Sequence, residues 1–137
     1  NILDLFSGSG SFGLECISRG AKNVIFVENY LQAINILKKN IDLLNASKNC
    51  ELIQNDCFKY FENDKAIKGN FDIIFIDPPY KEKKINFLLE KIKKKKILDK
   101  NGLVILHRHK KDNVKINDKF QIIDQRTYGI SKIIIGN

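Results

Sequence analysis

The sequence of 137 residues contains no methionine, only two prolines and only three cysteines. Cys16, Cys50 and Cys57 form an odd set without the paired spacing of metal ligands, which argues against a disulfide framework and is typical of a reducing cytosol. No apolar stretch approaches the roughly 20 residues that a membrane span needs, and the start lacks a signal-peptide pattern. We therefore expect a cytoplasmic protein. Because Asn1 already lies in a strand pattern, we also expect a fragment that lacks its native N-terminal segment.

Apolar residues and positive charge are abundant. An apolar content of 43% predicts one domain with its own core over residues 1–137, and no internal repeat or linker divides it. The formal charge of +8 favours a polyanionic partner such as nucleic acid. The run Lys91 to Lys96 continues a helical pattern that has one apolar face, so we interpret it as a solvated helix face rather than a phosphate track.

Strand-like and helix-like patterns alternate along the chain. The strand patterns cover residues 1–6, 24–27, 51–54, 73–76, 102–106, 120–124 and 130–135. The helix patterns begin near residue 14, continue at 34–44, where Ile34, Leu37, Ile41 and Leu44 share a face, and recur at 57–68 and 85–92. This alternation predicts an α/β fold: a mostly parallel twisted sheet with helices on both faces and an antiparallel strand near one edge.

A glycine-rich turn separates the first strand from the first helix. Gly8, Gly10 and Gly13 fit the spacing G-x-G-x-x-G, in which the first two glycines let the backbone approach a ligand and the third lets helix and strand pack closely. Glu28 ends the next strand 20 residues after Gly8, where an acid can accept hydrogen bonds from ribose hydroxyls. The pattern predicts a site for an adenosine cofactor, either a dinucleotide or S-adenosylmethionine. A plain glycine turn beside a solvated glutamate is the structural alternative.

The tetrapeptide Asp77-Pro78-Pro79-Tyr80 follows the apolar run 73–76. Neither proline can continue a sheet or a helix, so the backbone must leave the sheet there and present a carboxylate, proline carbonyls and an aromatic ring. These groups match the exocyclic amine of a flat base, which has two donors on a stackable ring. The alternative is a helix entry, with Asp77 as N-cap and Tyr80 covering the sheet edge.

This tetrapeptide also favours one cofactor over the other. A hydride-transfer enzyme needs a proton donor and usually a second domain, for which 137 residues leave little room. Methyl transfer needs only a nucleophile aligned with the sulfonium methyl and stabilisation of the charge that grows on its nitrogen. Hydrogen bonds from the amine to Asp77 and to the Pro78 carbonyl would provide both. No metal is required, and we expect none.

Several stretches together resemble the bacterial 16S rRNA (guanine-N2) methyltransferases of the D type. They are Asp4 to Glu15, Ser18 to Ala21, Phe26 to Glu28, Asn55-Asp56 and Phe75 to Tyr80, and Tyr128-Gly129 resembles the closing segment of that family. The resemblance covers nearly the whole chain. It implies a Rossmann-like methyltransferase fold, S-adenosylmethionine as donor, and the N2 amine of a guanine in 16S rRNA or a small-subunit particle as acceptor.

The resemblance also implies roles for residues at matching positions. Glu28 would hold the ribose, Asp56 the adenine amine, and the glycine loop the methionine part of the donor. The predicted cofactor-binding residues are Asp4, Phe6, Gly8, Gly10, Glu28, Asn55, Asp56 and Asp77. The predicted catalytic residues are Asp77, Pro78, Pro79 and Tyr80, and those predicted to contact nucleic acid are Tyr80, Lys81, Lys83 and Lys84. For Asp4 the alternative is a buried acid that caps the loop, and for Asp56 a turn-forming residue.

The chain departs from the family at the end of the fifth strand. Relatives commonly carry an acid where this chain has Leu106-His107-Arg108-His109, so the role of that acid does not transfer. His107 and His109 alternate and share a face, a spacing that also suits metal ligation, although no third ligand is evident. Other functions that remain open are a DNA adenine-N6 methyltransferase, a dinucleotide-binding oxidoreductase and a non-catalytic RNA-binding module. We expect a monomer.

Overall fold

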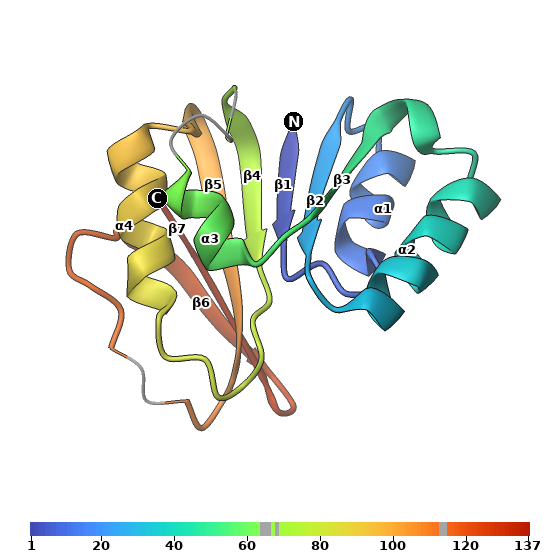
Figure 1. Cartoon of the computed structure of the whole chain (residues 1–137). Coiled ribbons are helices and arrows are strands. Elements are labelled where there is room, and N and C mark those ends of the chain that lie inside the picture. Colours follow the sequence, from blue (N-terminus) through green and yellow to red (C-terminus); the bar gives the residue numbers. More distant parts are fainter. Residues whose placement is uncertain (64–66, 68, 113–114) are drawn as a thin grey trace.

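The computed structural model describes residues 1–63, 67, 69–112 and 115–137. Its centre is one seven-stranded sheet with the strand order β3-β2-β1-β4-β5-β7-β6 (Figure 1). The strands are β1 (Ile2–Leu5), β2 (Val24–Glu28), β3 (Cys50–Gln54), β4 (Phe71–Ile76), β5 (Leu98–His109), β6 (Ile122–Tyr128) and β7 (Ser131–Gly136). The pairs from β3 to β5 are parallel, whereas β7 is antiparallel to both β5 and β6. The predicted sheet is confirmed.

Helices cover both faces of the sheet, as predicted. Helices α1 (Ser11–Ser18) and α2 (Leu31–Leu43) lie on one face, and α3 (Cys57–Glu62) and α4 (Ile85–Lys95) lie on the other, with a short 3-10 helix, η1 (Ser47–Asn49), before β3 (Figure 1). Each face has its own apolar cluster: Phe26 packs with α1 and α2, whereas Ile74 packs with α3 and α4. We call these the α1/α2 face and the α3/α4 face.

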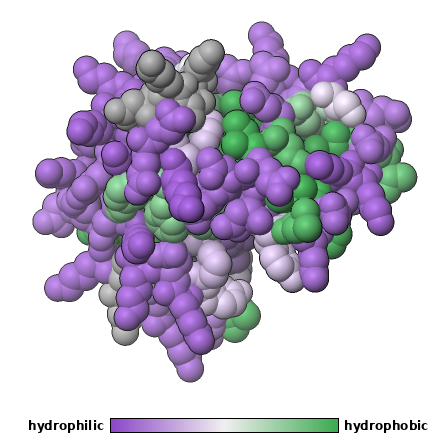
Figure 2. Space-filling model, in the orientation of Figure 1, coloured by the Kyte–Doolittle hydropathy of each residue, from purple (hydrophilic) through white to green (hydrophobic). Residues whose placement is uncertain are grey.

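The central strands are mainly apolar because helices bury both of their faces. All four residues of β1 are buried, between β2 and β4. Gly13 lets α1 approach closely, since a Cβ there would lie 2.3 Å from Phe26 Cε1. In the view of Figure 2 the surface is mostly hydrophilic, and hydrophobic residues gather over β2 and β3. Among the described residues, no helix has the length and hydropathy required to cross a bilayer.

Several predicted boundaries were wrong. Leu44 is not on the buried face of α2, because the helix ends at Leu43 and Leu44 is 61% exposed. Helix α3 ends at Glu62 rather than continuing to residue 68, and residues 64–66 and 68 lie outside the described part. Strand β5 is longer than predicted in both directions. Residues 126–128 belong to β6, so the turn before β7 consists of Gly129 and Ile130 alone.

Candidate active site at the carboxyl edge of the sheet

The glycine turn and the Asp77–Tyr80 segment leave the same edge of the sheet. Leu5 and Ile76, the last residues of β1 and β4, are register partners, and the Asp77 N–H donates to the Leu5 carbonyl at 3.3 Å. The rings of Phe12 in α1 and Phe75 in β4 stack with their centroids 3.9 Å apart. The two segments therefore meet at the carboxyl edge of the sheet. It is the place where parallel α/β sheets bind ligands.

The glycine turn owes its shape to left-handed backbone conformations. Gly8 has φ of 55° and Gly10 φ of 81°, and the Gly10 N–H donates to the Ser7 carbonyl at 2.8 Å. A Cβ on Gly8 would meet none of the described atoms within 4 Å, so this backbone is open to a ligand. Phe6 also has a positive φ, of 58°, and its ring packs edge-on against Phe58 at 5.8 Å.

Glu28 joins β2 to the glycine turn. Its Oε2 accepts from the Gly8 N–H at 2.8 Å, and its Oε1 accepts from the N–H groups of Asn29 and Tyr30, each at 2.8 Å. The residue is only 9% exposed. The carboxylate is therefore held in a fixed position by three backbone donors, and Oε2 keeps a lone pair for a further donor.

Asp4 lies beneath the turn and is 1% exposed. Its Oδ2 accepts from the Gly13 N–H at 3.0 Å, which is the capping contact considered as its structural role. Its Oδ1 is buried without a hydrogen-bond partner among the described residues. Burial, reinforced by repulsion from Asp77 and Glu28, raises the pKa of Asp4 to about 7, against the lowering effect of the Gly13 N–H.

Asp56 forms the N-cap of α3. Its Oδ1 accepts from the N–H groups of Phe58 and Lys59 at 2.9 and 3.0 Å, and its Oδ2 accepts from Asn29 Nδ2 at 3.4 Å. The neighbouring Asn55 N–H donates to the Glu28 carbonyl at 3.0 Å. The Asn55 contact brings the end of β3 beside the end of β2. Of the two Asp56 oxygens, Oδ2 makes the weaker hydrogen bond, because its bond to Asn29 is long.

Beyond β4, Pro78 is buried, Pro79 is exposed and Tyr80 is 59% exposed. The Asp77 carboxylate has a partner that the sequence did not reveal: His107 Nδ1 lies 2.7 Å from Asp77 Oδ1. Because a carboxylate only accepts, His107 Nδ1 carries the hydrogen. The contact follows from the register of β4 and β5, in which Ile76 pairs with Leu106.

The remaining predicted contacts lie around this segment. Lys81, Lys83 and Lys84 are exposed, and Lys84 Nζ lies 5.7 Å from the centroid of the Phe58 ring. The His109 ring lies edge-on to Tyr80 with 5.5 Å between centroids, so the two histidines both reach the Asp77–Tyr80 segment. No group of three or more His, Cys, Asp or Glu that could hold a metal occurs among the residues described.

The acids of this edge suit a cationic ligand. Asp4, Glu28 and Asp77 stand at the ends of three adjacent strands, and the influence of Glu28 and Asp77 on the pKa of Asp4 shows that they share one electrostatic environment. A sulfonium cofactor with an ammonium group matches this charge, and its ribose hydroxyls match the spare lone pair of Glu28. The residues therefore fit S-adenosylmethionine.

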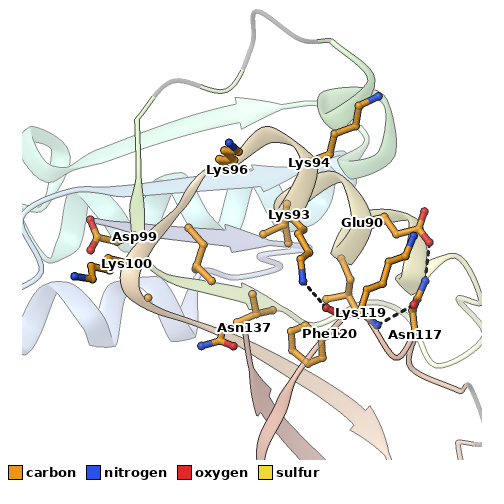
Figure 3. A pocket seen from close by; sticks show the side chains of 15 residues that line it. Glu90, Lys93, Lys94, Lys96, Asp99, Lys100, Asn117, Lys119, Phe120 and Asn137 are labelled. Atoms are coloured by element: carbon orange, nitrogen blue, oxygen red, sulfur yellow. Dashed lines mark hydrogen bonds between the residues drawn. The ribbon is translucent and has the colours of Figure 1, made fainter.

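A separate cavity of about 540 Å³ lies away from this edge, between the end of α4 and the start of β5 (Figure 3). Leu89, Leu98 and Phe120 contribute to its wall, and Lys94, Lys96 and Lys100 lie around it. It contains none of the predicted site residues.

The strand order, the glycine turn and the acids at the carboxyl edge define a Rossmann-like, S-adenosylmethionine-dependent methyltransferase fold. The same fold occurs in SMU.776, solved in complex with SAH, with a TM-score of 0.79 and 20% identity over 99% of this chain and 44% of that chain. The chain belongs to the family described as Conserved hypothetical protein 95, whose model matches residues 1–137. The predicted fold, family and cofactor are confirmed.

Two curated relatives and one solved structure illustrate the similarity. YlbH of Bacillus subtilis is 32% identical over 97% of this chain and 73% of its own length. Ribosomal RNA small subunit methyltransferase D of Haemophilus influenzae is 32% identical over 93% of this chain and 66% of its own length. A conserved hypothetical protein of Streptococcus pyogenes superposes with a TM-score of 0.88 and 29% identity, over 98% of this chain and 83% of that chain.

Proposed function

We propose that this protein transfers a methyl group from S-adenosylmethionine to the exocyclic N2 amine of a guanine in 16S rRNA, free or within a small-subunit particle. The observation that carries the proposal is the junction of the glycine turn with Asp77 at the ends of β1 and β4. The Haemophilus relative, named as a small-subunit rRNA methyltransferase, supports the choice of RNA.

The electrostatics of this edge argue against a dinucleotide. In a dinucleotide site the N–H groups of the glycine turn bind an anionic pyrophosphate. Here the Gly8 N–H already donates to the Glu28 carboxylate at 2.8 Å, and Asp4 and Asp77 lie nearby. A diphosphate would meet three acids, whereas a cationic sulfonium is attracted by them.

The acceptor amine is the proposed partner of Asp77. His107 engages Oδ1, so Oδ2 is the oxygen available to accept from an amine N–H, together with the Pro78 carbonyl. The donor supplies an electrophilic methyl group, and these acceptors stabilise the positive charge that grows on the amine nitrogen. The exposed Tyr80 ring offers a stacking surface for the base.

Methylation assays would test the substrate. The protein is incubated with labelled S-adenosylmethionine and, in parallel, with unmodified small-subunit particles, naked 16S rRNA and duplex DNA, and the modified base is mapped. Label at a guanine N2 in either rRNA sample is the expected result. Label confined to adenine N6 in DNA would refute the proposal and support the adenine alternative. Thermal stabilisation by NAD but not by S-adenosylhomocysteine would refute the cofactor.

Replacing Asp77 with alanine should separate catalysis from donor binding. We expect kcat to fall by about 10² to 10³, the typical effect of removing one preorganised group that stabilises transition-state charge. The Kd for S-adenosylhomocysteine should change much less, by about twofold, because its thioether sulfur carries no charge for Asp77 to attract and the proposed partner of Asp77 is the acceptor amine. Asp72→Ala is the matched control, since Asp72 is an exposed aspartate at the other end of β4. A large loss of donor affinity in Asp77→Ala would contradict this role.

A further inference from the structure

We infer that two consecutive side chains of β5, His107 and Arg108, position the acceptor loop, which we define as residues 77–82. The inference rests on the proposed function, because it assigns these residues a part in presenting Asp77 and Tyr80 to the acceptor base. Neither residue need touch the base.

The acceptor loop cannot be held by an ordinary backbone ladder. At its start the Asp77 N–H donates to the Leu5 carbonyl at 3.3 Å, but Pro78 and Pro79 have no N–H to donate, so the loop beyond Asp77 depends on its carbonyls and side chains for fixed contacts with the sheet. Within it, the Glu82 N–H donates to the Pro79 carbonyl at 2.8 Å, a local turn that does not tie the loop to the sheet. Contacts from β5 supply that attachment.

His107 fixes the catalytic carboxylate. Its side chain is 21% exposed and that of Asp77 is 43% exposed, so the 2.7 Å hydrogen bond between them lies in a partly buried position at the rim of the site. Holding Oδ1 restricts rotation of the carboxylate and keeps Oδ2 facing the proposed amine.

Arg108 fixes the loop backbone from the opposite face of β5, because successive residues of a strand point to opposite faces. Its side chain is 3% exposed. Nη2 donates to the Glu82 carbonyl at 2.9 Å and to the Tyr80 carbonyl at 3.4 Å, and Nε donates to Asp112. Burying a guanidinium is costly, and only a planar group with several donors could satisfy two loop carbonyls and a carboxylate together.

The two contacts hold both ends of the loop. Arg108 holds the backbone at Tyr80 and Glu82, and His107 sets the direction of the Asp77 carboxylate. Displacement of a reacting group by about 1 Å can lower a rate by about 10², so loosening either contact should affect turnover more than binding of the donor. The glycine turn, Glu28 and Asp4 keep their own hydrogen bonds in either variant.

The test uses graded substitutions measured with saturating donor. His107→Ala should lower kcat about 10- to 100-fold. His107→Asn, whose amide N–H can still donate to Asp77, should recover most of that loss. Arg108→Lys keeps the positive charge but loses the planar set of N–H donors, and should lower kcat by a similar factor. Arg126→Lys, an exposed arginine on β6, is the matched control and should leave kcat unchanged.

Two readouts do not need turnover. Nitrogen NMR of wild-type His107 should show the hydrogen on Nδ1, and amide exchange at residues 80–84 should become faster in Arg108→Lys while exchange in β1 and β2 stays slow. If Arg108→Lys does not fold, the comparison of His107→Ala with His107→Asn still tests the inference, because His107 is only partly buried. Unchanged kcat in His107→Ala, or equal losses in His107→Ala and His107→Asn, would overturn the inference. A wild-type protein that methylates no substrate would refute the proposed function instead, and the NMR and exchange results would still test the positioning.

Discussion

At the scale of single residues, the three acids of the carboxyl edge differ in the hydrogen-bond donors that their carboxylates contact. Glu28 receives three backbone N–H groups, Asp77 a histidine, and Asp4 one backbone N–H with a buried oxygen left over. An unsatisfied buried carboxylate is destabilising. Asp4 is therefore the acid of the site that destabilises the folded protein. A cationic donor bound nearby would offset this effect.

Replacing Asp4 with asparagine should make stability less dependent on pH. In the folded state its pKa is about 7, above the ordinary value of 3.8, so the folded protein retains a proton that the unfolded chain has released. Its contribution is thus most favourable at low pH and is lost as pH rises from about 4 to about 7, by up to about 4 kcal/mol. The asparagine side chain does not titrate. The free energy of unfolding of Asp4→Asn, measured relative to wild type, should therefore be higher at pH 8 than at pH 4.

Urea unfolding of both proteins at pH 4, 6 and 8 measures this effect. Asp42→Asn, at an exposed position of α2, is the control and should follow wild type. A difference in free energy of unfolding between wild type and Asp4→Asn that is the same at all three values would contradict the buried titration.

At the scale of elements, a helix or strand could be predicted where its own residues show an apolar pattern or a turn residue at its end. β1 and β4 are mainly apolar runs bounded by a glycine turn and by prolines. β4 ends at Ile76 as expected, and β1 ends at Leu5, one residue before the predicted end. β6 was misplaced because most of its residues are exposed and have no apolar alternation. Its position is set by pairing with β7, where Asp124 opposes Ile135 and Tyr128 opposes Ser131. Leu44 fits the helical period, yet the chain leaves the helix one residue earlier.

The same distinction applies to the site. Gly8, Glu28 and Asp77 could be identified because each lies next to a recognisable strand end. The contact of His107 with Asp77 could not, because it depends on the register between two strands joined through α4. A register is fixed by packing across the whole sheet, and a shift of one residue would turn His107 to the other face.

Gly13 offers a test of how closely α1 and β2 pack. A Cβ there would lie 2.3 Å from Phe26 Cε1 and 2.7 Å from Val24 Cγ1, and Phe26 is fully buried. We expect Gly13→Ala to lower the free energy of unfolding by about 1 to 3 kcal/mol, because the overpacking exceeds the gain in helix propensity. Combining it with Phe26→Leu, which removes the obstructing ring, should cost less than the sum of the two single changes. Additive losses in urea unfolding would show that the ring is not the obstacle.

At the scale of the whole molecule, charge is distributed in two ways that suit two ligands. The net charge is +8, yet acids gather where the donor would bind. The exposed Lys81 lies in the acceptor loop and the exposed Lys83 and Lys84 follow it, so they are available to phosphates of the proposed RNA substrate. A cationic donor and a polyanionic substrate can thus be drawn to neighbouring parts of one edge. The arrangement also implies that the two binding events respond differently to salt, since only the second releases many counterions.

The salt dependence of RNA binding should therefore identify the lysines in contact with phosphate. We compare Lys81, Lys83 and Lys84, all changed to glutamine, with an equal reduction of charge at Lys94, Lys96 and Lys100 beside the cavity of Figure 3. The first variant should bind 16S rRNA more weakly, and its plot of log Kobs against log salt should be shallower by up to about 0.7 for each phosphate that is no longer neutralised, or about 2 in total. The second should keep the wild-type slope, and both should bind S-adenosylhomocysteine normally. Equal changes of slope in both variants would mean that the positive charge acts only as a diffuse field, without a track beside the acceptor loop.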